Sequence, residues 1–425
     1  MDQAIGTLCV LAIAAFLFAT ELIPLAVTAM GSAIVLGIMG VLTTKEVFAG
    51  LSNSTVVLFA GMFVIGASMF HTGLAQKIGT VVVQKAGVKE NRLMLAIMTV
   101  TIILSAVSSN TGTVAALMPV IIGICGVAKL SAPRQLMPLA VAANAGGTIT
   151  LIGTPPNLIV SGSLQAAGLE PFGFFEFAWI GIPLSIMAIL YMMIIGKKLL
   201  PKRIVENMVV NDQTDSIKTE NIQNKTKMWI SGLILLGVVG CMGLNLEWLP
   251  LQMAAVAGAL LCVLTKCLTE KQAYNGIDWV TIFLFAGMLS VATAMEKSGA
   301  GKLVADYVVT LLGDTPSPVV ITAALFVLSC GLTQFMSNTA AAALLGPIGI
   351  SIAQSIGASP YPVLMAIGIA ASCAYTTPVA TPPNTLVLGP GQFTFMDYIK
   401  CGTPLCLLSL IICLVVIPLV WPFFP

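Results

Sequence analysis

Two short motifs of neutral polar residues each occur twice in this otherwise apolar chain. The first is Ser-Asn-Thr, at residues 109–111 and again at 337–339. The second is Thr-Pro-Pro-Asn, at residues 154–157 and again at 381–384. Hydroxyl and amide groups donate hydrogen bonds to anions, and their oxygens are hard ligands for small cations. The motifs therefore predict the binding of small ions rather than acid–base or nucleophilic chemistry.

Each Ser-Asn-Thr motif predicts the start of a helix, because Ser, Asn and Thr are favoured N-cap residues. A helix that starts at membrane depth directs free N–H groups, and about half a positive charge, at whatever lies ahead of it. Plain helix capping is the alternative for a single motif. A second copy in a matching polar break favours a binding role in addition to capping.

Each Thr-Pro-Pro-Asn motif predicts a break in a helix. Adjacent prolines remove two backbone donors and force the preceding residue out of helical geometry. The Ala-Gly-Gly stretch at 145–147 loosens the approach to the first break. Broken backbone is tolerated at membrane depth only where it is buried in protein or lines a polar cavity. Both breaks are therefore expected beside a cavity, and a proline kink in a lipid-facing helix is the alternative.

The composition places these motifs in a lipid bilayer. Of 425 residues, 19 are Lys or Arg and 17 are Asp or Glu, so 8% are charged, against about 25% in soluble proteins. Too few charges are present to cover a soluble surface, which predicts a polytopic membrane protein. The net charge of +2 gives no indication of a nucleic-acid partner.

The ionisable side chains argue against an enzyme. Each acidic residue lies in or beside a predicted loop, and the one histidine, His71, ends an apolar run. Proton relays place ionisable groups inside the membrane. An intramembrane hydrolase or acyltransferase needs a nucleophile with a base, or paired acids, at the same depth. We therefore expect a transporter, with a channel as an alternative that a saturable flux would exclude.

The elements that position the motifs form two matching series of apolar runs. Ser109 and Ser337 are 228 residues apart, and Thr154 and Thr381 are 227 apart, which indicates a duplication. Five full spans in each half is an odd count, so the second half is inverted relative to the first. We predict an all-α polytopic membrane protein with two inverted repeats of five spans. Each repeat contains a re-entrant helical hairpin and a broken helix.

The predicted bounds follow from the lengths of the apolar runs. The first repeat is residues 1–196, with a hairpin at 92–128, a broken helix at 134–168 and further spans at 4–20, 22–42, 54–70 and 177–196. The second repeat is residues 228–425, with a hairpin at 318–356 and a broken helix at 360–390. A polar linker, 197–227, joins them. The span count does not decide whether the hairpins re-enter, but their polar tips between short apolar arms favour re-entry.

The basic residues predict the orientation. With the N-terminus outside, 16 Lys and Arg residues fall on the inner side and 3 on the outer side, which is the bias expected of inner loops. This predicts a multi-pass protein of the cell (inner) membrane. Its N- and C-termini are outside and its linker is cytoplasmic.

Four helix breaks in two inverted halves predict one binding site near the membrane midplane. The hydroxyl groups that could donate to an anion belong to Thr111, Thr154, Thr339 and Thr381. The side-chain oxygens that could bind a small cation, together with freed carbonyls, belong to Ser105, Ser109, Asn110, Thr333 and Asn338.

The paired Ser-Asn-Thr tips and paired Thr-Pro-Pro-Asn breaks resemble those of the divalent anion/sodium symporter (DASS) family of di- and tricarboxylate and sulfate carriers. The resemblance covers essentially the whole chain. It implies a homodimer, a scaffold and a transport domain in each copy, and an elevator-type movement. It also implies two or more sodium ions, one held by Ser105, Ser109, Asn110 and Gly153 and a second by Thr333, Asn338 and Ala380. The substrate carboxylates would be held by Asn110, Thr111, Asn338 and Thr339, with Thr154 and Thr381 assisting.

We therefore expect a secondary active transporter that carries small dianions such as succinate, fumarate or malate and is coupled to sodium. The family also includes exchangers that use no sodium, although the hydroxyls of Ser105 and Thr333 favour sodium. A sodium-independent dicarboxylate exchanger and a sulfate or citrate carrier are the alternatives.

Overall fold

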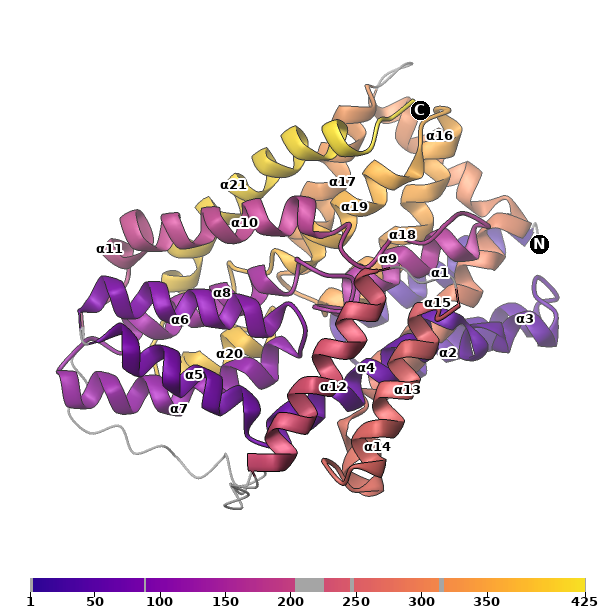
Figure 1. Ribbon diagram of the computed structural model, residues 1–425. Helices are drawn as coiled ribbons and strands as arrows, with labels where there is room; N and C mark the ends of the chain where they lie inside the picture. The colour runs from indigo at the N-terminus through magenta and orange to yellow at the C-terminus, as the bar shows by residue number, and fades with distance from the viewer. Residues whose placement is uncertain (1–2, 88, 203–224, 245–247, 313–316, 425) are drawn as a thin grey trace.

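The computed structural model describes residues 3–87, 89–202, 225–244, 248–312 and 317–424. Every regular element in these ranges is a helix (Figure 1). Seven of the described helices are long and apolar enough to cross a membrane. The chain is therefore an all-helical, multi-pass membrane protein, as its composition predicts.

The first half of the chain contains ten main helices, which follow one another through short connections. Their bounds are α1 (Gln3–Thr20), α2 (Leu25–Ile38), α3 (Thr44–Ala49), α4 (Ser54–His71), α5 (Leu74–Ala86), α6 (Glu90–Ser105), α7 (Asn110–Ala128), α8 (Pro133–Gly146), α9 (Pro155–Ala166) and α10 (Ala178–Tyr191). A π-helical turn then leads into the short α11 (Lys197–Leu199). Most of the predicted linker, 203–224, lies outside the described residues.

The second half has the same order of long and short helices. Their bounds are α12 (Lys225–Gly243), α13 (Leu251–Leu264), α14 (Glu270–Gly276), α15 (Trp279–Ser298), α16 (Ala300–Leu312), α17 (Pro318–Leu332), α18 (Asn338–Ser355), α19 (Pro360–Ser372), α20 (Pro382–Leu388) and α21 (Phe395–Val420). The last three residues of the predicted linker, 225–227, form the start of α12.

Helix α2 is shorter than the predicted span 22–42, and its counterpart in the second half, α13, is equally short. Helices α2 and α13 have 14 residues each, which is about 21 Å of helix against a hydrocarbon core of about 30 Å. Pro24 and Pro250 precede their first turns, and residues with left-handed backbone, Gly40 and Lys266, follow their ends. The residues that follow form short helices, α3 and α14, which begin with capping boxes at Thr43 and Thr269.

Helices α5 and α16 are elements that the apolar runs did not predict. They separate their apolar and polar faces more strongly than most of the other described helices, so neither forms an apolar run of spanning length. Each follows a long helix, α4 or α15, and precedes a hairpin. They are connecting helices between a span and a hairpin.

The second segment of each broken helix packs against helices of the other half of the chain. The first is interrupted between Gly146 and Pro155, and the second between Ser372 and Pro382. Helix α9 packs against α18 and α19, whereas α20 packs against α7 and α8 (Figure 1). The second segment of each broken helix therefore lies against the hairpin of the other half, which brings all four motifs together.

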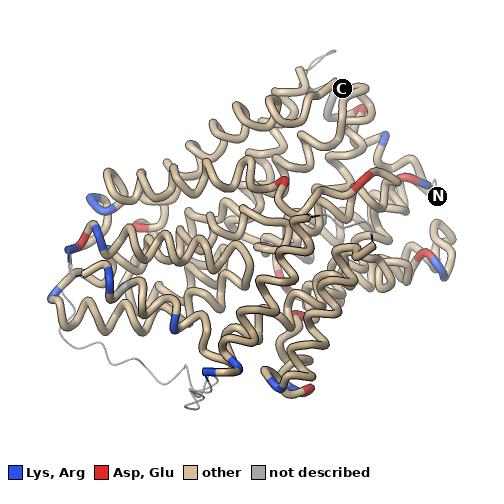
Figure 2. Tube along the Cα trace, viewed as in Figure 1, with Lys and Arg blue, Asp and Glu red and all other residues tan. Residues whose placement is uncertain are grey.

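Charged residues lie at the ends of the helices (Figure 2). Lys and Arg residues gather at the left and lower ends in this view, and few lie on the right beside the N-terminus. Lys297 at the end of α15 pairs with Glu46 of α3. The middle of the molecule carries few charged residues.

Candidate functional site

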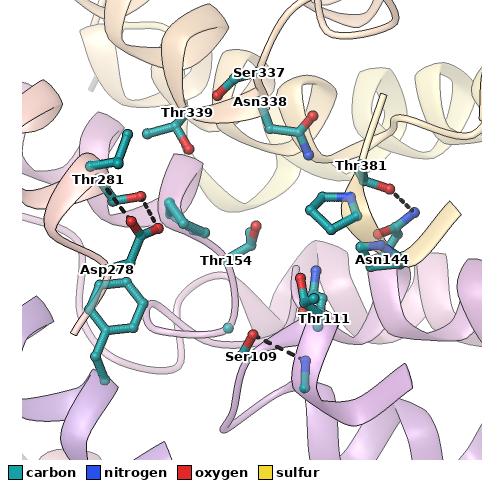
Figure 3. Close-up of a pocket in the computed structure, with 18 of the residues that line it drawn as sticks. Ser109, Thr111, Asn144, Thr154, Asp278, Thr281, Ser337, Asn338, Thr339 and Thr381 are labelled. Carbon is teal, nitrogen blue, oxygen red and sulfur yellow. Dashed lines mark hydrogen bonds between the residues drawn. The ribbon is translucent and has the colours of Figure 1, made fainter. Parts of the chain in front are cut away.

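A cavity of about 1070 Å³ lies where the four motifs meet. It is lined by all six residues predicted to bind the substrate and by three of those predicted to bind sodium alone, namely Asn110, Thr111, Thr154, Asn338, Thr339, Thr381, Ser109, Gly153 and Ala380. Figure 3 shows that Thr111, Thr154, Thr339 and Thr381 come from four different segments around this space. Ser105 and Thr333 do not line the cavity and are fully buried. Ser105 hydrogen-bonds Asn110, and Thr333 hydrogen-bonds Asn338.

The second helix of each hairpin begins at the cavity. Ser109 caps α7 by accepting a hydrogen bond from the Gly112 amide at 3.3 Å. Ser337 caps α18 in the same way, from the Ala340 amide at 3.4 Å. Capping and exposure to the cavity therefore occur together, and the positive end of each helix dipole points toward the cavity.

The Asn110 amide lies among oxygens of three other residues. One of its terminal atoms is 2.6 Å from Ser105 Oγ, 3.3 Å from the Ala143 carbonyl oxygen and 3.2 Å from the Gly153 carbonyl oxygen. With nitrogen in that place, the two N–H groups of the amide have these three oxygens as acceptors. With Oδ1 there, four oxygens converge, which is the donor set that a small hard cation prefers. These residues thus fit a sodium ion.

The second half has a similar cluster. Thr333 Oγ1 lies 2.5 Å from Asn338 Oδ1 and 2.7 Å from the Ala371 carbonyl oxygen, and its single proton can be donated to either. Ser105 Oγ contacts Asn110 and the Ala143 carbonyl in the same manner. Ser105 and Thr333 therefore connect each hairpin tip to the first segment of a broken helix, α8 or α19, through hydrogen bonds.

The asparagine of each Thr-Pro-Pro-Asn motif holds its break in shape. Asn157 Nδ2 donates to the carbonyls of Gly147 at 3.1 Å and Thr150 at 2.9 Å. Asn384 Nδ2 donates to the carbonyls of Ala374 and Thr377, both at 2.9 Å. These carbonyls have lost their helical partners, so a buried amide is needed to satisfy them. The sequence revealed the motif but not this role.

The first break also requires glycine at two positions. A Cβ atom on Gly153 would lie 2.4 Å from the Gly147 carbonyl oxygen. A Cβ atom on Gly147 would lie 2.8 Å from both terminal atoms of the Asn110 amide. Backbone and amide approach so closely here that no side chain fits between them.

The cavity wall also contains polar residues that were not predicted, among them Asn144 and Asp278. Asn144 of α8 lines the cavity although it is 1% exposed. Asp278 caps α15, because its carboxylate accepts from the Thr281 amide at 3.2 Å and the Thr281 hydroxyl at 2.6 Å (Figure 3). The spacing of Asp278 and Thr281 is a capping signal, but nothing in it indicates a cavity. Asn144 has no motif around it.

Substitution Asn157→Ala tests the role of the motif asparagine. We expect it to destabilise the protein by about 2–4 kcal/mol. The buried Gly147 carbonyl would lose its donor, and the Thr150 carbonyl would keep only the Gly153 amide. The measurement is the thermal unfolding midpoint of the purified protein in detergent. Asn91→Ala is the matched control, since the Asn91 side chain is exposed and accepts a hydrogen bond from Lys197. Equal midpoints for the two variants would contradict this role.

Comparison with solved structures shows a shared fold. The structure is similar to the YdaH transporter of Alcanivorax borkumensis, with a TM-score of 0.65, 16% identity and coverage of 88% of this chain and 87% of that chain. It is also similar to MtrF of Neisseria gonorrhoeae, with a TM-score of 0.58, 16% identity and coverage of 90% and 83%. Both comparisons support the all-helical, multi-span architecture.

Comparison of sequences finds transporters over the full length of the chain. An uncharacterized transporter of Haemophilus influenzae is 32% identical over 96% of this chain and 90% of its own. YfbS of Escherichia coli, likewise an uncharacterized transporter, is 26% identical over 99% and 100%. The sodium-dependent dicarboxylate transporter SdcS of Staphylococcus saprophyticus is 26% identical over 98% and 86%.

A model of the citrate transporter family (CitMHS) matches residues 15–358 and 325–423. Together these matches cover nearly the whole chain, and they agree with the transporter predicted from the motifs. The relationship to divalent anion/sodium symporters is confirmed. The chain belongs to the citrate transporter family and is a transporter, not an enzyme.

Proposed function

We propose that the protein is a sodium-coupled secondary carrier of small dianions, with C4-dicarboxylates such as succinate, fumarate and malate as its substrates. The observation that carries the proposal is the cavity itself. Two helix starts and two broken helices face one another across it, and its polar groups are mainly hydroxyls and amides. The name of the SdcS relative supports the same substrate class and the same coupling ion.

The dianion is bound by neutral donors. Asn110 and Thr111 hold one carboxylate and Asn338 and Thr339 the other, while the hydroxyls of Thr154 and Thr381 assist. The described residues that line the cavity include no Lys or Arg. Each helix start contributes about 0.3–1 kcal/mol, and up to about 2 where it is partly buried. This avoids the cost of about 2.5–3.5 kcal/mol for a basic side chain at the membrane centre.

Two or more sodium ions supply the remaining attraction. The first site consists of Ser105, Ser109, Asn110 and Gly153, and the second of Thr333, Asn338 and Ala380. The convergence of oxygens on Asn110 and Asn338 supports both. Because Asn110 and Asn338 contact both an ion and the solute, binding of one favours binding of the other. That shared contact is the physical basis of coupling.

Movement of the site relies on the repeat. We propose two inverted repeats, 1–196 and 228–425, whose hairpins enter and leave on the same side of the membrane. The recurrence of α1–α10 as α12–α21 supports this. The N- and C-termini are placed outside and the linker in the cytoplasm, as the distribution of basic residues favours. Two copies form a homodimer, within which the hairpins and broken helices move as an elevator.

Uptake into proteoliposomes tests the proposal. We expect accumulation of labelled succinate only with an inward sodium gradient, because the cation sites must be filled to hold a dianion. If sodium charges outnumber anion charges by one, 100 mV adds about 2.3 kcal/mol, or roughly 50-fold accumulation. Potassium replacing sodium is the control. Robust uptake without sodium would favour the exchanger, and stronger competition by sulfate or citrate than by malate would change the substrate.

A further inference from the structure

We infer that Asn144 is a positioning residue, which turns the hydroxyl of Thr381 into a hydrogen-bond donor for the solute and joins the two halves of the site. The inference rests on the proposed function, because it concerns the same cavity. It gives a role to the most buried polar side chain of the cavity wall, one that none of the sequence motifs contains.

Asn144 reaches from the first broken helix to the second. Its Nδ2 donates to Thr381 Oγ1 at 3.3 Å and to Asn384 Oδ1 at 3.2 Å, and the first of these bonds is drawn in Figure 3. The three residues are each at most 4% exposed. These bonds join the end of α8 directly to the start of α20.

The orientation of the Asn144 amide follows from its neighbour. Asn384 uses its Nδ2 for the carbonyls of Ala374 and Thr377, so its Oδ1 must face Asn144. Because that oxygen can only accept, Asn144 has to present its nitrogen. The Oδ1 atom of Asn144 then has no hydrogen-bond partner among the described residues. The Asn384 amide thus fixes the orientation of the Asn144 amide, so that Asn144 Nδ2 rather than Oδ1 faces the Thr381 hydroxyl.

The consequence is that the hydroxyl hydrogen of Thr381 remains available for donation. A hydroxyl has one O–H group and can accept at its lone pairs. Since Thr381 Oγ1 already accepts from Asn144, its proton is left for another acceptor, and within the described part of the chain its side chain makes no further hydrogen bond. Thr381 lines the cavity, so a carboxylate bound there is the acceptor. Because Asn144 occupies the hydroxyl as an acceptor, Thr381 acts as a donor toward the cavity, which favours an anion as its partner.

The second half lacks this arrangement. Ser105 and Thr333 bond the carbonyls of Ala143 and Ala371, each 38 residues further along the chain. The next residues, Asn144 and Ser372, are therefore equivalent. Ser372 instead bonds the Gly368 carbonyl within its own helix at 3.2 Å. Among the described residues the bridge runs from α8 to the second break and not from α19 to the first, which makes Ser372 a matched control.

Substitution Asn144→Asp is the sharpest test. It keeps the shape of the side chain but replaces the donor by an acceptor, so the Thr381 proton would turn toward the new carboxylate and away from the solute. We expect the KM for succinate to rise about tenfold or more, as for the loss of one charge-assisted hydrogen bond. Thermal stabilisation by sodium chloride without succinate is expected to persist, because Asn144 is not one of the proposed ion ligands. Ser372→Ala is expected to keep the wild-type KM.

A double variant shows whether Asn144 acts through Thr381. Thr381→Val removes the hydroxyl, and in that background Asn144→Asp is expected to change the KM little further. Should Asn144→Asp not purify as a folded protein, Asn144→Ser tests the same bridge without charge, because its side chain is too short to reach both partners.

A wild-type KM in either Asn144 variant, or additive effects in the double variant, would overturn the inference. Loss of sodium stabilisation in the Asn144 variants would also overturn it and would identify an ion ligand instead. If the wild-type protein itself takes up no dicarboxylate, the proposed function fails and not this inference alone.

Discussion

Asn110→Ala is expected to abolish sodium-dependent succinate uptake. The Asn110 side chain lies within hydrogen-bond distance of Ser105 and of the Ala143 and Gly153 carbonyls, and it stands at the start of α7 in the cavity wall. On the proposed function, alanine would remove an ion ligand and a solute donor together. Loss of three such contacts costs about 3 kcal/mol, or roughly 100-fold in transport rate at limiting substrate. Initial rates in proteoliposomes measure the effect.

Asn338→Ala is expected to have the same effect, because Asn338 holds the equivalent place beside Thr333. Asn91→Ala serves as the control for expression and insertion, since Asn91 lies on the exposed surface near Lys197. A normal transport rate in Asn110→Ala or Asn338→Ala would remove that residue from the proposed site.

Gly153→Ala is expected to reduce uptake about as strongly, although it removes no functional group. The added Cβ atom would meet the Gly147 carbonyl oxygen at 2.4 Å, and backbone atoms cannot yield as the end of a flexible side chain can. The break must therefore open, which moves the Gly153 carbonyl away from Asn110. The sodium concentration that gives half-maximal uptake is expected to rise more than tenfold, because changes to residues that orient metal ligands commonly weaken metal binding by that much.

Gly126→Ala provides the matched control for that substitution. Gly126 is an exposed helical glycine in α7, and a Cβ atom there would meet nothing within 4 Å. We expect wild-type uptake and wild-type sodium dependence from this variant. If Gly153→Ala behaves in the same way, the close packing of the break has no part in ion binding.

The sequence predicts the site better than the scaffold around it, for a physical reason. Proline pairs and Ser-Asn-Thr triplets restrict the backbone locally, so breaks at 147–154 and 373–381 and helix starts at Asn110 and Asn338 follow from a few residues each. Their duplication then indicates that they meet. The apolar runs do not predict the amphipathic helices α5 and α16, because their apolar residues recur every three or four positions and do not form a continuous run.

The residues missed in the site depend on contacts between distant segments. Asn144 sits within a helix whose sequence carries no motif at that position, and its role arises only when α20 packs on α8. Asp278 is recognisable as a cap but not as part of a cavity wall. A single sequence records local restrictions on the backbone, whereas such partners depend on how the two halves pack.

A cryo-electron-microscopy structure of the protein with sodium and succinate tests the central claim most directly. The account predicts solute density in the cavity of about 1070 Å³, within hydrogen-bond distance of Thr111 and Thr339, and ion density among the oxygens of Ser105, Asn110 and Gly153. A second cavity, of about 440 Å³, has Glu296, Lys302 and Asp306 among the residues that line it. Succinate bound there while the space between the two hairpin tips holds only water would contradict the account.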